Sequence, residues 1–149
     1  MSPIRRILVP IDFEPPSKQA LDLAIDLART LGASVVLLHV YDVQMMAYPM
    51  APMINMAQID EAVRVSAAKA LDESVAAAQE RFEGATGILR RGNTWEAVLA
   101  AASEVGADLI VMGTHGRRGL AHALLGSVAE KIVRMSPVPV LTIRPSPSA

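Results

Sequence analysis

The sequence contains no cysteine, and this absence excludes several kinds of chemistry. Disulfide bonds, thiolate metal sites and cysteine nucleophiles cannot occur. Aromatic residues make up only 3% of the 149 residues, whereas hydrophobic residues make up 52%. The core must therefore consist of aliphatic side chains and alanine. The three histidines, His39, His115 and His122, lack the spacing of a zinc site, so no metal-binding residue is predicted.

An excess of charge of either sign is also missing. The net charge is −1 and the pI is about 6.3, which argues against a nucleic-acid partner. The first residues contain no apolar signal segment. The longest uncharged stretch, residues 43–59, is interrupted by Pro49 and Pro52 and is unsuited to crossing a membrane. We therefore predict a cytoplasmic protein with no membrane partner, whose residues 1–149 form a single domain.

Short apolar runs alternate with amphipathic stretches along the whole chain. Strands are predicted at residues 7–11, 34–40, 88–89, 109–112 and 138–143, and helices between them, the longest at 58–82. Continuous apolar strands separated by helices are typical of a parallel sheet that is covered on both faces. The fold class is therefore α/β, with a five-stranded parallel sheet.

Local signals predict where the helices begin and end. Ser17 is expected to cap the first helix, and Gly32 to end it. Two stretches have the spacing of a capping box, Asn93 with Glu96 and Ser127 with Glu130. Three further glycines are expected to serve turns or helix ends, namely Gly84, Gly87 and Gly106.

A glycine-rich loop joins the fourth predicted strand to the last helix. Glycines allow close backbone approach to a ligand, and N–H groups at a helix start attract anions. The pattern is neither a Walker A loop nor a dinucleotide fingerprint. From the spacing alone, a phosphate site and a connection whose glycines only serve turns are equally compatible. The residues concerned are Gly113, Gly116, Arg117, Arg118, Gly119, Gly126 and Ser127.

Asp12 follows the first predicted strand, as Gly113 follows the fourth. If the strand order is 3-2-1-4-5, both lie where the order reverses, the usual ligand position in such sheets. A carboxylate beside a phosphate loop suits a ribose hydroxyl. The alternative is a turn residue that caps the following helix. No nucleophile elbow or acid–base carboxylate pair is visible, so no catalytic residue is predicted.

Two further features leave alternatives open. His39 is expected to be packed, with one ring nitrogen hydrogen-bonded, whereas His115 lies within the glycine-rich loop and could meet the ligand. Five of the eight methionines lie in residues 43–57. This Met-rich segment can either cover the domain's own core or bind a partner.

The spacing Gly113-x2-Gly116-x9-Gly126-Ser127 resembles the signature of the universal stress protein family, in its ATP-binding branch. The resemblance implies a Rossmann-like fold of the adenine-nucleotide alpha hydrolase type. It also implies a homodimer that forms through the last strand, residues 138–143. It extends over nearly the whole chain and includes Val9 to Asp12, His39 and Val40, Gly92 to Glu96, and Ser136 to Ile143.

The resemblance also implies a nucleotide site. ATP, or AMP or ADP, would bind with Mg²⁺ or Mn²⁺ bridged through the phosphates, in a homodimeric, nucleotide-dependent stress-response regulator. The alternatives are a slow ATPase or autokinase, and a nucleotide-independent interaction module that uses the Met-rich segment. The implied nucleotide-binding residues are Pro10, Ile11, Asp12, Val40, Met112, Gly113, His115, Gly116, Arg117, Gly119, Gly126, Ser127 and Val128.

Overall fold

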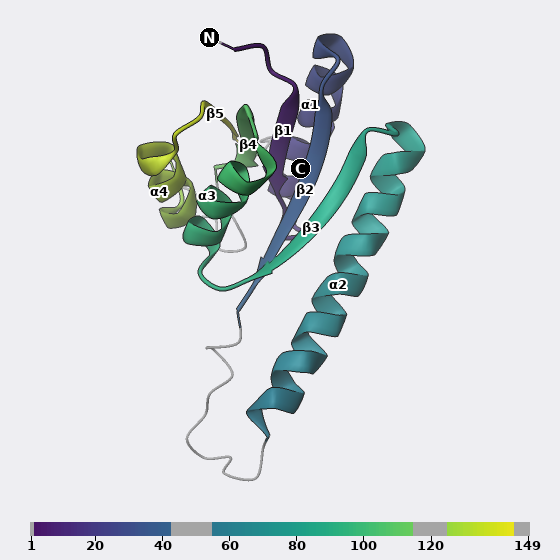
Figure 1. Ribbon diagram of the computed structural model, residues 1–149, viewed down its shortest axis with the longest axis vertical. Helices are drawn as coiled ribbons and strands as arrows, with labels where there is room; N and C mark the ends of the chain where they lie inside the picture. The colour runs from purple at the N-terminus through teal and green to yellow at the C-terminus, as the bar shows by residue number, and fades with distance from the viewer. Residues whose placement is uncertain (1, 43–54, 115–124, 145–149) are drawn as a thin grey trace.

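The structure is a computed structural model that describes residues 2–42, 55–114 and 125–144. Strands and helices alternate along the chain, as the hydrophobic pattern predicts (Figure 1). The strands are β1 (Arg6–Pro10), β2 (Ser34–Tyr41), β3 (Ala85–Arg91), β4 (Leu109–Gly113) and β5 (Val140–Ile143). The helices are α1 (Pro15–Leu31), α2 (Met56–Arg81), α3 (Thr94–Val105) and α4 (Ser127–Met135).

The five strands form one sheet in the order β3-β2-β1-β4-β5. Every neighbouring pair is parallel, so each connection crosses over through a helix. The predicted order 3-2-1-4-5 is therefore confirmed. The order reverses between β1 and β4, which places a switch point beside the centre of the sheet.

Two aliphatic cores lie on the two faces of the sheet. Alternate β1 residues point to opposite faces, so Ile7 and Val9 pack with α1 and α2, whereas Leu8 packs with α3 and α4. Ile7, Leu8 and Val9 have no exposed surface. Alanines on the helices complete both cores, as the shortage of aromatic residues predicts.

Two of the predicted helix caps are wrong by a few residues. α1 begins at Pro15 after Glu14, which places Ser17 inside the first turn. Proline suits this position because the first N–H groups of a helix have no intrahelical acceptor. α4 begins at Ser127, as predicted, but its cap is Gly126, so Ser127 is not the cap of a capping box. The cap at Asn93 is confirmed, since its side chain accepts from the N–H of Glu96 at 3.4 Å.

The predicted turn at Gly87 is also wrong, because β3 is longer than expected and contains this glycine. A β-carbon at Gly87 would lie 2.5 Å from Cγ2 of Val75 on α2. Glycine therefore lets the long helix approach the strand closely. The helix-ending glycines are confirmed, with φ of +67° at Gly32 and +66° at Gly106.

β1 and β4 separate at Pro10. Their paired residues end at Leu8 and Ile110, whereas β1 continues beside β2 as far as Pro10. The N–H of Ile11 bonds to Leu38 of β2, and the carbonyl of Arg6 accepts from Asp108 beside β4. Successive residues of a strand direct their backbone groups to opposite neighbouring strands, so the nitrogen of Pro10 faces β4. As a proline, Pro10 has no N–H to donate there. The separation thus leaves no unpaired donor on Pro10.

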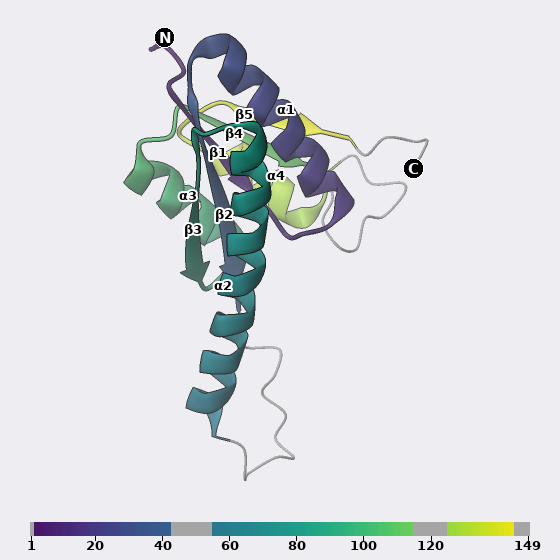
Figure 2. The same cartoon turned by 90° about the vertical axis from the view of Figure 1, so that its right-hand side faces the viewer.

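The N-terminal part of α2 projects beyond the carboxyl ends of the strands (Figures 1 and 2). Its buried residues, Ala67, Leu71 and Ala78, lie in the part that covers the sheet. Asn55 caps the projecting end by accepting from the N–H of Ala57 at 2.9 Å. Within the described ranges, no helix has both the length and the apolar character needed to span a membrane.

Candidate functional site

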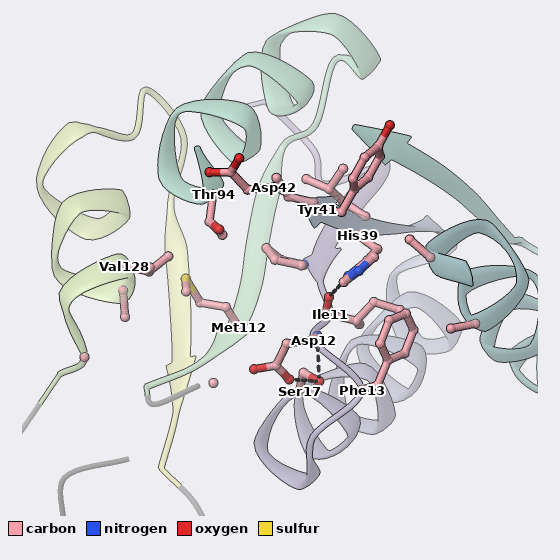
Figure 3. A pocket seen from close by; sticks show the side chains of 18 of the residues that line it. Ile11, Asp12, Phe13, Ser17, His39, Tyr41, Asp42, Thr94, Met112 and Val128 are labelled. Atoms are coloured by element: carbon pink, nitrogen blue, oxygen red, sulfur yellow. Dashed lines mark hydrogen bonds between the residues drawn. The ribbon is translucent and has the colours of Figure 1, made fainter. Parts of the chain in front are cut away.

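A cavity of about 820 Å³ lies at the carboxyl ends of the strands. It occupies the switch point where β1 and β4 separate, which is the position expected for a ligand in such a sheet. Its volume is within the range of small-molecule sites. Figure 3 shows its labelled side chains, which come from both faces of the sheet.

The cavity brings together many of the predicted site residues. They come from the ends of β1, β2 and β4 and from the start of α4, namely Pro10, Ile11, Asp12, Val40, Met112, Gly113, Gly126 and Val128. Ser127 is exposed and does not line the cavity. Four other predicted residues lie outside the described ranges, namely His115, Gly116, Arg117 and Gly119.

Asp12 is held by a small network of hydrogen bonds. Its Oδ1 accepts from the hydroxyl of Ser17 at 2.9 Å and from the N–H of Glu14 at 3.0 Å. The N–H of Asp12 donates back to Oγ of Ser17 at 3.3 Å. The other carboxylate oxygen, Oδ2, points into the cavity, away from Ser17 (Figure 3). Asp12 therefore offers one oriented acceptor to a ligand.

An aromatic pair lies beside this carboxylate. Phe13 has a φ of +66°, a left-handed conformation that is rare for a bulky residue. Its ring centroid lies 4.5 Å from that of His39. Nδ1 of His39 is 2.9 Å from the carbonyl oxygen of Ile11, so this nitrogen carries the proton and donates. The predicted packing of His39, with one nitrogen hydrogen-bonded, is confirmed.

The start of α4 forms another wall of the cavity. The N–H of Gly126 donates to the carbonyl of Thr114 at 2.6 Å, so that group is already used within the protein. The N–H groups of Ser127 and Val128 belong to the first helical turn, which has no intrahelical acceptors. These groups and the helix dipole favour an anion at this wall.

The charged side chains of the cavity wall are acidic. Among the described lining residues, Asp12 and Asp42 have carboxylates, and none is lysine or arginine. Glu61 and Arg64 form an exposed ion pair on α2 near the cavity. The hydrogen bond from Arg64 to Glu61 lowers the pKa of Glu61 and raises the pKa of Arg64. An anionic ligand therefore requires compensating charge from backbone N–H groups, from residues 115–124 or from a cation.

Sequence reasoning missed one side of the cavity. Small residues on α2, namely Ala62, Val63, Ser66, Ala67 and Ala70, line it together with Tyr41 and Phe13. Their recurrence at three- and four-residue intervals places them on one helical face, but the same pattern predicts ordinary packing. Thr94, at the start of α3, was also missed, although its position next to the Asn93 cap indicated a strand-end location.

No group of three or more histidine, cysteine, aspartate or glutamate side chains suited to a metal ion occurs in the described part of the chain. The described side chains therefore provide no complete ligand set for a cation in this cavity. This donor set fits a metal that is bridged through phosphates, and it does not fit a protein-enclosed metal centre.

The sheet order and the cavity at the switch point define an α/β protein with a crevice where such sheets bind ligands. Comparison with known proteins then identifies the family. The model of the universal stress protein family matches residues 3–144. This chain belongs to the universal stress protein family.

Individual relatives cover the same length. The universal stress protein YxiE of Bacillus subtilis is 32% identical over 145 residues, which span 93% of this chain and 98% of the relative. A solved structure from the same family, from Burkholderia pseudomallei, is 32% identical with a TM-score of 0.70 and covers 98% of this chain and 99% of its own. The universal stress protein of Archaeoglobus fulgidus, solved in complex with dAMP, shares the fold at 23% identity, with a TM-score of 0.60 and coverage of 95% and 99%.

Proposed function

We propose that this protein binds an adenine nucleotide, ATP or else AMP or ADP, in the cavity at the switch point. One observation carries the proposal. The oriented carboxylate of Asp12 and the N-terminus of α4 line the same cavity, in the space where β1 and β4 have separated. A hydroxyl-bearing sugar suits the first group and a phosphate suits the second.

The remaining walls suit a nucleoside. Val40, Met112 and Val128 supply apolar contacts for a base, and Gly113 allows the chain to approach the sugar closely. Relatives with the same fold have been solved with adenine nucleotides, namely with dAMP and with cAMP, which supports this class of ligand. In the proposed complex, His115, Gly116, Arg117 and Gly119 complete the phosphate site with Gly126 and Ser127.

A divalent cation accompanies the nucleotide in this proposal. Because Asp12 and Asp42 are the charged side chains of the described wall, several phosphate charges would meet no cationic partner there. Mg²⁺ or Mn²⁺ held by the phosphates would offset this charge without a protein-built cage.

The proposed role is that of a cytoplasmic, nucleotide-dependent regulator of a stress response, with the chain as one domain and a homodimer as its assembly. β5 supports the dimer because, among the described residues, it is an edge strand that pairs with β4. Leu141 in β5 and Val133 and Met135 in α4 are large exposed hydrophobic residues on the elements at this edge. An unpaired strand edge of this kind suits pairing with a second copy.

Calorimetric titration with ATP and magnesium tests the proposal, together with mass spectrometry of any nucleotide that co-purifies. We expect saturable binding, and we expect the affinity to fall by at least about tenfold in Asp12→Asn. Asparagine has no negative charge and one side-chain oxygen fewer, so it cannot accept the same charge-assisted hydrogen bond. Asp72→Asn, an exposed substitution on α2, is the matched control and should bind normally. A folded protein that ignores ATP, ADP, AMP and cyclic AMP would refute the proposal.

A further inference from the structure

We infer that Ser17 is a positioning residue, whose hydroxyl fixes the Asp12 carboxylate in the orientation that receives ribose hydroxyls. This inference rests on the proposed nucleotide function. In it, Asp12 recognises the sugar hydroxyls of the ligand, and Ser17 orients Asp12 for this contact. Ser17 does not cap its helix, so its burial in the first turn of α1 calls for another role.

The hydroxyl of Ser17 lies at the centre of a closed set of contacts. It accepts from the N–H of Asp12 at 3.3 Å, and it lies within donor distance of Oδ1 of Asp12, at 2.9 Å, and of the carbonyl of Glu14, at 3.0 Å. A hydroxyl has one hydrogen to donate, and a carboxylate is the stronger acceptor of the two. Ser17 therefore holds both the backbone and the side chain of Asp12.

A second set of contacts holds the backbone on both sides of Asp12. The left-handed turn at Phe13 brings the N–H of Glu14 back to Oδ1 of Asp12. Phe13 packs on the ring of His39, which in turn donates to the carbonyl of Ile11. The residues immediately before and after Asp12 are thus both tied to the same imidazole.

The two oxygens of the Asp12 carboxylate therefore have different roles. Oδ1 is committed to Ser17 and Glu14, and Oδ2 faces the cavity (Figure 3). Without the Ser17 hydroxyl, the carboxylate loses one of its two anchors and can rotate about its side-chain torsions. Pre-orientation raises affinity by removing the entropy cost of ordering the group when the ligand binds.

The first test uses pairs of nucleotides that differ only at the sugar. We expect Ser17→Ala to weaken magnesium–ATP binding by about tenfold, the scale of a charge-assisted hydrogen bond. The same variant should change the affinity for 2′,3′-dideoxy-ATP by less than about twofold, because that ligand gives Asp12 no hydroxyl to receive. Ser34→Ala is the matched control, since Ser34 donates to the carbonyl of Arg5 at the amino end of the sheet.

The second test needs no nucleotide. A crystal structure of Ser17→Ala should show the Asp12 carboxylate turned away from the N–H of Glu14, and this amide should exchange with solvent about tenfold faster by NMR. Equal losses for ATP and the dideoxy nucleotide, or an Asp12 carboxylate that keeps its position in the variant, would overturn the inference. Failure of the wild-type protein to bind any nucleotide refutes the proposed function, and the nucleotide-free test still decides whether Ser17 positions Asp12.

Discussion

Thr114 and Gly126 are joined by a hydrogen bond from the N–H of Gly126 to the carbonyl of Thr114, with a length of 2.6 Å. Thr114 is buried at 3% exposure and follows β4, while Gly126 caps α4. The glycine-rich connection between them therefore leaves and returns at a single point on the cavity wall. The bond therefore fixes the distance between the two ends of this connection.

This bond can be removed without altering the backbone conformation at Gly126. Gly126 has a φ of −70°, which proline adopts readily, so Gly126→Pro removes the N–H while Gly126→Ala keeps it. We expect trypsin to cut after Arg117 or Arg118 about fivefold faster in Gly126→Pro than in the wild type. The lost hydrogen bond is worth about 1 kcal/mol, which corresponds to a factor of this size. Equal cleavage rates in the proline and alanine variants would contradict the anchoring role of this bond.

The positive φ of Phe13 predicts an unusual order of stability among its variants. Both Phe13→Ala and Phe13→Gly lose the contact with His39 and keep a φ of +66°, which costs free energy for alanine but not for glycine. We expect the glycine variant to be more stable by about 1 kcal/mol in urea denaturation. Ala76→Gly on the exposed face of α2 should show the opposite sign, a loss of about 1 kcal/mol. If alanine were more stable than glycine at both positions, the result would argue against strain at Phe13.

The close approach of α2 to β3 predicts a steric cost at Gly87. In Gly87→Ala, the added methyl group would meet Cγ2 of Val75 at 2.5 Å and Cγ of Leu71 at 3.4 Å. We expect a loss of about 1–3 kcal/mol in the free energy of unfolding. In the double variant Gly87→Ala/Val75→Ala, the loss of stability should be smaller than the sum of the two single losses by at least about 1 kcal/mol. The second substitution removes the methyl group that the first one would meet. Additive effects would show that the contact does not limit the packing.

The single tryptophan provides an optical probe of the cavity. Nζ of Lys131 on α4 lies 5.5 Å from the ring centroid of Trp95, and Trp95 is next to Thr94 on the cavity wall. We expect Lys131→Met to change the Trp95 emission and to cost about 0.5–1 kcal/mol of stability, whereas Lys69→Met should do neither. ATP should still alter the emission in the Lys131 variant. Unchanged emission in that variant would show that the ammonium group does not reside over the ring in solution.

The sheet order and the meeting of Asp12 with Gly113 could be predicted because few topologies join parallel strands through right-handed crossovers. Each residue follows an apolar run whose end is marked in the sequence. The aliphatic character of the core followed in the same way from composition. These features depend on patterns that repeat along the chain, which is where sequence reasoning is strong.

The role of Ser17 could not be predicted, because it depends on which residue begins α1. The serine looked like a cap, but the two prolines before it occupy the first helical positions and move the start to Pro15. The left-handed backbone at Phe13 had no sequence signal, since a bulky residue rarely adopts that conformation. The hydrogen bonds between Asp12 and Ser17 are therefore visible only in the structure.

Pro10 gives the central crevice a kinetic consequence. Because β1 and β4 separate where proline has no N–H, the space between them is open without any broken ladder bond on that residue. A ligand that enters therefore displaces solvent and leaves every main-chain hydrogen bond of the sheet intact. We therefore expect its association rate to show no step for an activated opening of the sheet.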